Sequence, residues 1–320
     1  MAEYQGELYA LGAAFFWAVG SILFHRAQVS AAALNLFKNI LGAVLLVATL
    51  AWMAWRSESA TVFHWDPTAW SWLALSAVVG IAVGDTCYFR SLQILGPRRA
   101  LILTTVAPPA AVLLGWWVLG EGESLIGLLG IAITLVGVVW VVRERGAESE
   151  AAGHFPGSLM RGTVYGVAGA LCQAVGAIWS KQGLVALQQF TPHAAMEATF
   201  VRLLFAAGAG FLVGLAGRRL WHWGRQILQR KTLLVITPAA FVGTYLGIWF
   251  SLLAFEYTNV GIATTLTSTS PVFVLPLVWL FLRQRVSWRA ILGALVATVG
   301  VVLLFAGDPL WRFVVGLFGG

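Results

Sequence analysis

Residues 80–120 read GIAVGDTCYFRSLQILGPRRALILTTVAPPAAVLLGWWVLG, and residues 243–283 read GTYLGIWFSLLAFEYTNVGIATTLTSTSPVFVLPLVWLFLR. The two stretches follow one pattern, because an interval of 163 residues places glycine on glycine, threonine on threonine and proline on proline without a gap. The matched pairs are Gly80 with Gly243, Gly84 with Gly247, Thr104 with Thr267, and Pro108 with Pro271. An internal repeat of this kind indicates a chain built from two similar halves.

The repeat extends beyond these stretches on both sides. The same interval places Gly130 on Gly293 and Gly137 on Gly300. An interval of 156 residues overlays the first apolar run on the sixth. It matches Gly6, Tyr9, Ala14, Ala18, Val19, Gly20 and Ile22 with Gly162, Tyr165, Ala170, Ala174, Val175, Gly176 and Ile178. The second and seventh runs align less firmly and place Lys38 on Arg202.

The composition places the chain in a membrane. Of its 320 residues, 59% are hydrophobic and only 10% are charged, and the mean hydropathy is +0.84. A soluble domain carries roughly 25% charged residues, so a soluble enzyme, a nucleic-acid-binding domain and a disordered chain are disfavoured. The apolar runs are continuous and about 20 residues long, which favours membrane helices over the alternating strands of a barrel.

We expect ten membrane spans, at residues 8–24, 32–54, 70–90, 100–119, 125–142, 162–181, 194–215, 233–255, 261–282 and 288–306. These spans divide the chain into a first five-helix repeat at 1–145, a polar linker at 146–160, a second five-helix repeat at 161–306 and a short tail at 307–320. Because five is an odd number, the second half crosses the membrane in the opposite sense. The predicted fold is an all-α membrane protein of ten transmembrane helices in two inverted repeats, a plan that many secondary transporters use.

These residues resemble the drug/metabolite transporter superfamily, specifically its EamA-type members with ten helices. The resemblance covers about 6–306 and is strongest from Gly84-Asp85-Thr86 through Ala107-Pro108 to Leu119-Gly120-Glu121. The second copy departs from the family pattern, since Arg283-Gln284 stands where Gly-Glu is usual. The resemblance implies a multi-pass metabolite carrier of a bacterial-type inner membrane, often an exporter, and leaves its cargo open.

Charged side chains inside the apolar runs are the first candidates for a binding site, because each costs roughly 2.5–3.5 kcal/mol to insert. Lys38 and Arg202 occupy similar places in the second and seventh runs. On opposite sides of a central cavity they would attract an anionic or carboxylate-bearing substrate. The alternatives are snorkelling to the headgroups and an ion pair between Arg202 and Glu197.

Asp85 is the one aspartate well inside a run. It would take up a proton or bind a substrate ammonium group; alternatively it is a structural partner for Arg90 or Tyr88. We predict proton coupling at Asp85 and Glu197. The predicted substrate-binding residues, beyond Lys38, Asp85 and Arg202, are aromatic, hydroxyl or amide side chains: Trp17, Tyr88, Thr104, Gln173, Tyr245, Trp249, Thr267 and Ser268. Their alternative roles are hydrogen bonds between helices and the aromatic belt.

Glycines and prolines inside the runs are expected to shape the helices. Gly80, Gly84, Gly243 and Gly247 allow close helix packing, with a hinge as the other interpretation. Pro108 and Pro271 remove backbone hydrogen bonds and therefore produce a gating bend or a permanent kink.

The sequence predicts a secondary transporter that moves a small metabolite, such as an amino acid or related solute, by alternating access. A lipid or lipid-linked molecule flippase is the main alternative. An intramembrane enzyme is disfavoured, because the sequence contains neither His-Glu-x-x-His nor Gly-x-Ser-x-Gly. We expect no cofactor, no metal and no nucleic acid. The expected partners are the solute and membrane lipids, and a monomer suffices, although a dimer is compatible with the sequence.

The positive charges lie mostly at one end of the predicted bundle. One end carries Arg56, Lys181 and Arg312, whereas the other carries Arg98, Arg99, Arg143, Arg145 and the loop 217–231. The positive-inside rule favours termini outside the cytoplasm, whereas the family resemblance implies termini inside.

Overall fold

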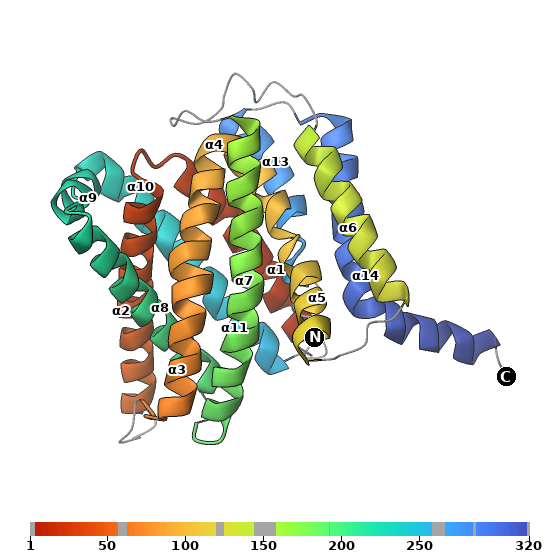
Figure 1. Cartoon of the computed structure of the whole chain (residues 1–320), viewed down its shortest axis with the longest axis horizontal. Coiled ribbons are helices and arrows are strands. Elements are labelled where there is room, and N and C mark those ends of the chain that lie inside the picture. Colours follow the sequence, from red (N-terminus) through yellow and green to blue (C-terminus); the bar gives the residue numbers. More distant parts are fainter. Residues whose placement is uncertain are drawn as a thin grey trace.

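The structure is a computed structural model that describes residues 4–56, 63–119, 125–143, 158–191, 193–257, 266–283 and 286–318 (Figure 1). Within these ranges the regular structure is helical. The elements are α1 (Gln5–His25), α2 (Ala31–Arg56), α3 (Pro67–Ser76), η2 (Ala77–Val83), α4 (Gly84–Thr104), α5 (Ala107–Leu119), α6 (Leu125–Arg143), α7 (Leu159–Gln188), α8 (Ala194–Ala216), α9 (Leu220–Ile227), α10 (Arg230–Ala240), η4 (Phe241–Leu246), α11 (Gly247–Tyr257), α13 (Ser270–Leu282) and α14 (Trp288–Phe318).

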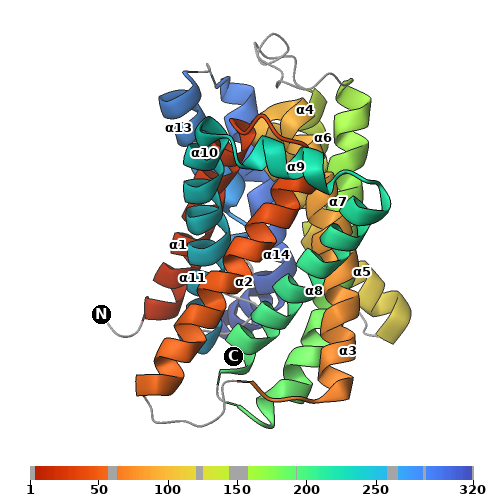
Figure 2. The same ribbon diagram turned by 90° about the vertical axis from the view of Figure 1, so that its left-hand side faces the viewer.

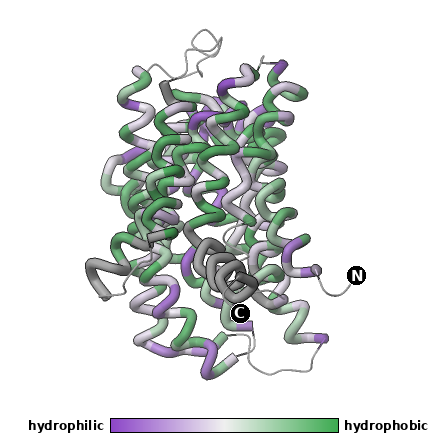
Figure 3. Tube along the Cα trace, turned by 90° about the vertical axis from the view of Figure 1, so that its right-hand side faces the viewer, coloured by the Kyte–Doolittle hydropathy of each residue, from purple (hydrophilic) through white to green (hydrophobic). Residues whose placement is uncertain are grey.

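Six helical stretches of the described chain are long and apolar enough to cross a membrane: Gln5–His25, Ala31–Arg56, Pro67–Thr104, Leu159–Gln188, Ala194–Ala216 and Arg230–Ser251. Shorter apolar helices cover Ile126–Val141, Ser270–Leu282 and Trp288–Leu303. Figure 3 shows hydrophobic residues along the helices and hydrophilic residues gathered mainly toward their ends. The chain is therefore an all-helical membrane protein, and the count of ten spans stays a prediction.

Local sequence signals determine where α3 begins and where α4 bends. The Asp66 side chain accepts a hydrogen bond of 2.6 Å from the backbone N–H of Ala69, and Pro67 follows as the first helical residue. This is the usual start of a helix. Within α4, Gly96 interrupts the helical backbone with φ 81° and ψ 168°, a conformation that glycine adopts without strain. Pro97 follows the bend.

Helix irregularities recur in the two halves at equivalent positions. The π-helical segments η2 and η4 begin at Ala77 and Phe241 and end 163 residues apart, at Val83 and Leu246. A second irregularity separates α4 from α5 at residues 105–106 and precedes α13 at residues 268–269. The predicted fourth span at 100–119 is therefore not one helix, because its chain is broken next to Pro108.

Pairs of glycines bring helices of the two halves into close contact. A Cβ atom built on Gly176 of α7 would lie 2.7 Å from the Cα of Gly80 in η2. A Cβ atom built on Gly20 of α1 would lie 2.5 Å from the Cα of Gly243 in η4. Gly20 corresponds to Gly176 and Gly80 to Gly243 in the repeat, so the same contact occurs twice with the halves exchanged. Only glycine permits this backbone approach.

The helices α6 and α14 pack along each other at one side of the structure (Figure 1). Gly137 of α6 faces Ala297, and Gly293 of α14 faces Val141. The predicted tail at 307–320 overlaps the end of α14, which the structure describes as helical to Phe318, and its separation from the second repeat stays a prediction.

The predicted basic loop at 217–231 also differs from the structure, which contains helix α9 there. Figure 2 shows α9 lying across the upright helices near one end of the bundle. Trp223 is buried against Ala33 and Leu36, whereas Trp221 on another face is exposed. The loop forms a helix because its apolar residues fall on one side, where they cover the bundle.

Candidate functional site

A cavity of about 440 Å³ lies among the helices of both halves. The helices that contribute to its wall are α1, α2, η2, α4, α5, α7, α8, η4, α11 and α13. The charged, hydroxyl, amide and aromatic side chains of the wall are Trp17, Ser21, Phe24, Lys38, Asp85, Tyr88, Phe89, Thr104, Thr105, Gln173, Arg202, Thr244, Thr267, Ser268 and Ser270.

An ion pair between Lys38 and Asp85 forms one side of this cavity. Lys38 Nζ lies 2.8 Å from Asp85 Oδ2, and the two side chains are 7% and 19% exposed. Lys38 comes from α2 and Asp85 from the first turn of α4. The alternative in which Lys38 snorkels to the headgroups does not hold in this structure, since its ammonium group turns inward to a carboxylate.

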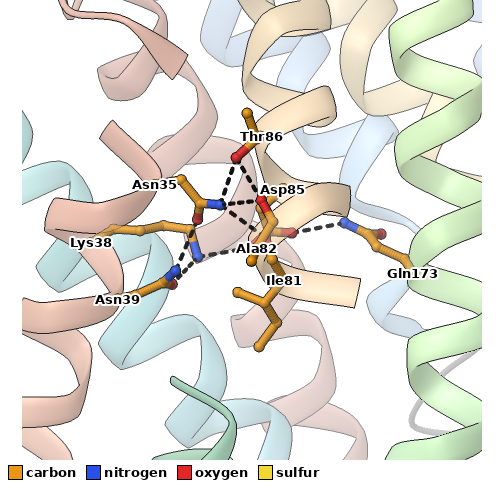
Figure 4. A network of polar contacts seen from close by, with 8 residues as sticks. All are labelled: Asn35, Lys38, Asn39, Ile81, Ala82, Asp85, Thr86 and Gln173. Carbon is orange, nitrogen blue, oxygen red and sulfur yellow. Dashed lines mark hydrogen bonds and ion pairs between the residues drawn. The ribbon is translucent and has the colours of Figure 1, made fainter. Parts of the chain in front are cut away.

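An amide network holds the ion pair in place (Figure 4). Lys38 Nζ also donates to Asn39 Oδ1 at 2.8 Å, and Asn39 Nδ2 donates to Asn35 Oδ1 at 3.1 Å. Asn35 Nδ2 lies within hydrogen-bond distance of the carbonyl of Ile81 at 2.8 Å and of Thr86 Oγ1 at 3.0 Å. The carbonyl of Ile81 belongs to η2, so the network connects α2 to the π-helical segment.

A second helix reaches the carboxylate from the other half of the chain. Gln173 Nε2 of α7 donates to Asp85 Oδ1 at 3.2 Å. Asp85 therefore has a partner on each oxygen, Lys38 on one and Gln173 on the other. Arg90 and Tyr88 were the partners suggested for Asp85 in a structural role; the contacts that the structure shows for its carboxylate are instead with Lys38 and Gln173 of other helices.

Arg202 of α8 lies on the same wall as the ion pair. Its Nε is buried and has no hydrogen-bond partner among the described residues. A Cβ atom built on Gly80 would lie 3.8 Å from Arg202 Nη2, so the guanidinium group lies close to η2. The alternative was an ion pair between Arg202 and Glu197. The described contacts do not contain this pair, because Glu197 contacts His64 instead.

Hydroxyl groups surround the two breaks in the helices. Thr104 and Thr105 donate to the carbonyls of Leu101 and Ile102 at 2.7 Å. In the second half Ser270 donates to the carbonyl of Thr267, also at 2.7 Å. These side chains bond to carbonyls of the preceding helical turn, and at Ile102 they do so in addition to the backbone N–H of Thr105.

Most, but not all, of the predicted site residues line the cavity. Of the predicted substrate-binding residues, the wall contains Trp17, Lys38, Asp85, Tyr88, Thr104, Gln173, Arg202, Thr267 and Ser268. It also contains the predicted gating or packing residues Gly80, Pro108, Gly243 and Pro271. The residues that lie outside the described wall are Gly84, Glu197, Tyr245, Gly247 and Trp249.

Tyr245 and Trp249 belong to a contact between helices instead. Tyr245 OH lies 2.7 Å from Thr49 Oγ1 of α2. Tyr245 packs with Leu46 and Leu203, and Trp249 adds to the same cluster. Gly84 and Gly247 are packing positions, because Cβ atoms built there would lie 3.1 Å from Cys172 Cβ and 2.5 Å from Trp17 Cδ1.

Glu197 is buried near the start of α8, away from the cavity wall. It accepts a short hydrogen bond from the backbone N–H of His64, and its Oε2 lies 3.4 Å from His64 Nδ1. It therefore fastens the segment before α3 to α8.

Sequence analysis missed Asn35 and Asn39. The spacing offered a signal, because Asn35 lies three positions before Lys38 and four before Asn39, and such positions fall on one helix face. An Asn-x-x-Lys-Asn face within an otherwise apolar span indicates a polar cluster, and that cluster is the one that holds Lys38.

Comparison with known proteins agrees with this architecture. The sequence model of the EamA-like transporter family matches residues 4–143 and 160–306. An uncharacterized transporter of Archaeoglobus fulgidus is 24% identical over 300 residues, covering 93% of this chain and 96% of that protein. Protein LicB of Haemophilus influenzae is 26% identical over 45% of this chain and 49% of its own length.

Two further comparisons concern a relative that matches a short segment and a solved structure with a similar fold. A probable transport protein of Saccharomyces cerevisiae is 32% identical over 96 residues, which are 30% of this chain and 27% of that protein. A solved crystal structure with 15% identity superposes with a TM-score of 0.59 over 93% of this chain and 95% of that one. Since the family match spans both halves, the chain belongs to the EamA-like transporter family and is a membrane transporter.

Proposed function

We propose that the protein is a secondary transporter that moves a small metabolite across the membrane by alternating access. Its ten spans would form two inverted five-helix halves, residues 1–145 and 161–306, joined by the linker 146–160. The recurrence of η2 in η4, 163 residues on, supports this plan. The sequence contains no Gly-x-x-x-x-Gly-Lys-Ser/Thr motif, so the proposed energy source is an ion or solute gradient.

The observation that carries this proposal is the Lys38–Asp85 ion pair on the wall of a cavity to which both halves contribute. Charges at such depth are rare and typically mark substrate or ion pathways. Broken helices next to a cavity are also typical of secondary transporters, in which the halves rock around the binding site. Export is the direction that we propose, from the resemblance to EamA-type members.

We propose proton coupling at Asp85. Protonation would remove the charge that holds Lys38 and would weaken the contact between α2 and α4. Glu197 was the second candidate, but it does not line the described cavity, so the proposal is restricted to Asp85. The cavity opens and closes in this account as Asp85 alternates between its charged and neutral forms.

The test is flux in proteoliposomes, with and without a proton gradient, for a panel of labelled amino acids, organic acids and amines. Asp85→Asn removes the charge at nearly constant size. Asp66→Asn is the matched control, because Asp66 caps α3 outside the cavity and asparagine is an equally good cap. Gradient-dependent flux that is lost in Asp85→Asn and kept in Asp66→Asn is the expected result. Flux indifferent to the gradient and to Asp85→Asn would make Asp85 structural, and movement of labelled lipids alone would favour a flippase.

A further inference from the structure

Among the described residues, the cavity wall carries more cations than anions. The described wall contains three charged side chains, Lys38, Asp85 and Arg202. Lys38 and Asp85 neutralise each other at 2.8 Å. Arg202 is near enough to Asp85 for the two charges to interact, but it lies within ion-pair distance of no described carboxylate, and its buried Nε has no hydrogen-bond partner among the described residues. The described wall therefore carries one positive charge in excess within the membrane part of the chain.

Comparison of the two halves shows that the second half has no carboxylate at the position equivalent to Asp85. Arg202 is the counterpart of Lys38, and the interval of 163 residues that relates the halves places Ile248 on Asp85. Both Asp85 and Ile248 line the cavity. Ile248 packs in a cluster with Leu203, the neighbour of Arg202. The first half thus supplies a cation and a carboxylate, whereas the second half supplies the cation alone.

We propose that the transported solute is an organic monoanion, and that its carboxylate binds Arg202 in place of the acidic side chain that the second half lacks. This inference rests on the transport function proposed above. A guanidinium group offers a planar fork of donors that matches a carboxylate. An unpaired charge in a low-dielectric interior is costly, so a solute that neutralises Arg202 is favoured over one that does not.

The charge of the cavity selects among solutes. A monoanion brings the wall to neutrality, whereas a dianion reverses its sign. A zwitterion places an ammonium group in the cavity, and the carboxylate that would receive it, Asp85, is already bound by Lys38 and Gln173. A cation adds to the excess. The aromatic side chains of Trp17, Phe24 and Tyr88 on the wall suit an apolar or aromatic remainder of the solute.

Two helix ends add to the preference for an anion. Helices α5 and α13 begin at the wall, at Ala107 and Ser270. The N-terminal end of a helix carries a partial positive charge, which stabilises anions. Pro108 and Pro271 at these ends have no backbone N–H, so fewer hydrogen-bond donors are available there than at an ordinary helix start.

Binding to the purified full-length protein tests the inference without knowledge of the natural solute. The probes are benzoate, benzamide, benzylamine and phenylalanine, which present one ring with an anionic, neutral, cationic or zwitterionic group. The readouts are the ligand-induced shift in Tm and the Kd. Arg202→Gln removes the charge, Ile248→Asp supplies the carboxylate that the second half lacks, and Ile248→Asn is the matched control without charge.

Benzoate is expected to bind more tightly than the other three probes. Arg202→Gln should weaken benzoate binding roughly 10- to 100-fold, the range expected for a lost charge-assisted hydrogen bond. Ile248→Asp should raise the Tm of the unliganded protein and abolish the benzoate preference, whereas Ile248→Asn should keep it. Since Ile248→Asp adds a partner, it remains informative if Arg202→Gln fails to fold.

Equal binding of benzoate and benzamide, or an unchanged benzoate preference in Ile248→Asp, would overturn the inference. Flux separates this failure from failure of the proposed function. Transport of a neutral or cationic solute with no preference for monoanions would contradict the inference alone. Absence of flux for every solute in the panel would count against the transport function itself.

Discussion

Lys38 Nζ and Asp85 Oδ2 lie 2.8 Å apart, so an ion pair between a buried lysine and a partly buried aspartate joins α2 to α4 on the wall of the cavity. Removing one member leaves the other without its counter-ion, which costs about 3–5 kcal/mol in a fully buried pair and less here, because Asp85 is partly exposed and each member keeps an amide partner. We therefore expect Lys38→Gln and Asp85→Asn each to lower the free energy of unfolding, by less than that amount.

The double variant Lys38→Gln/Asp85→Asn should lose less stability than the sum of the two single variants, because it leaves no isolated charge. Chemical denaturation of all four proteins in one detergent measures this coupling. Strictly additive losses would mean that the pair contributes nothing as a pair. The double variant is also the stability control for flux measurements on Asp85→Asn.

The contact between Gly176 and Gly80 predicts a large effect for a small substitution. A Cβ atom on Gly176 would lie 2.7 Å from the Cα of Gly80, so Gly176→Ala must push α7 away from η2. Overpacking of this kind costs about 1–3 kcal/mol. Gly208→Ala is the control, because a Cβ atom there meets no heavy atom within 4 Å. Thermal unfolding should show a lower Tm for Gly176→Ala and an unchanged or higher Tm for Gly208→Ala; similar Tm values for the two would refute the contact.

Tyr245→Phe tests whether the Tyr245 hydroxyl group stabilises the fold or takes part in solute binding. The change removes the hydroxyl group that lies 2.7 Å from Thr49 Oγ1, with an expected loss of about 0.5–1.5 kcal/mol in stability. Because Tyr245 lies outside the described wall, the Kd for a bound solute should stay the same. A marked rise in Kd with unchanged stability would place Tyr245 in the binding site instead.

The location of positive charge predicts the orientation in the membrane. The end of the bundle that carries α9 also carries Arg218, Arg219, Arg225, Arg230 and Lys231 (Figure 2). By the positive-inside rule this end faces the cytoplasm, which places both termini outside. The contrary expectation, termini inside, came from the family resemblance.

Cysteine labelling in intact cells distinguishes the two orientations. Gln189 follows α7 and Gln229 precedes α10, and both side chains are exposed. In a chain with Cys87→Ser and Cys172→Ser, a membrane-impermeant maleimide should label Gln189→Cys and spare Gln229→Cys. The reverse pattern would put the basic end outside and the termini inside.

The sequence predicted the repeat and much of the wall because those depend on residue types at fixed intervals. Gly80 and Gly243, or Pro108 and Pro271, are recognisable without coordinates, since glycine and proline act on the local backbone. Charged residues such as Lys38 and Asp85 stand out because the surrounding runs are apolar.

The sequence did not predict which groups meet across helices. The alternative role of Asp85 was a structural partnership along its own helix with Arg90 or Tyr88, but the partners that the structure shows, Lys38 and Gln173, come from α2 and α7. Pairing of this kind depends on how the helices are oriented and packed against each other. Local patterns in a single sequence do not reveal that packing. For the same reason Tyr245 was expected to line a cavity and instead contacts Thr49.

The most direct test of alternating access needs no knowledge of the solute. Ser268 lies on the cavity wall beside the break before α13. In the cysteine-free chain, the account predicts that Ser268→Cys reacts with an impermeant maleimide added to either face of oriented vesicles, while Gln189→Cys and Gln229→Cys each react from one face only. Reaction of Ser268→Cys from a single face under every condition would contradict alternating access.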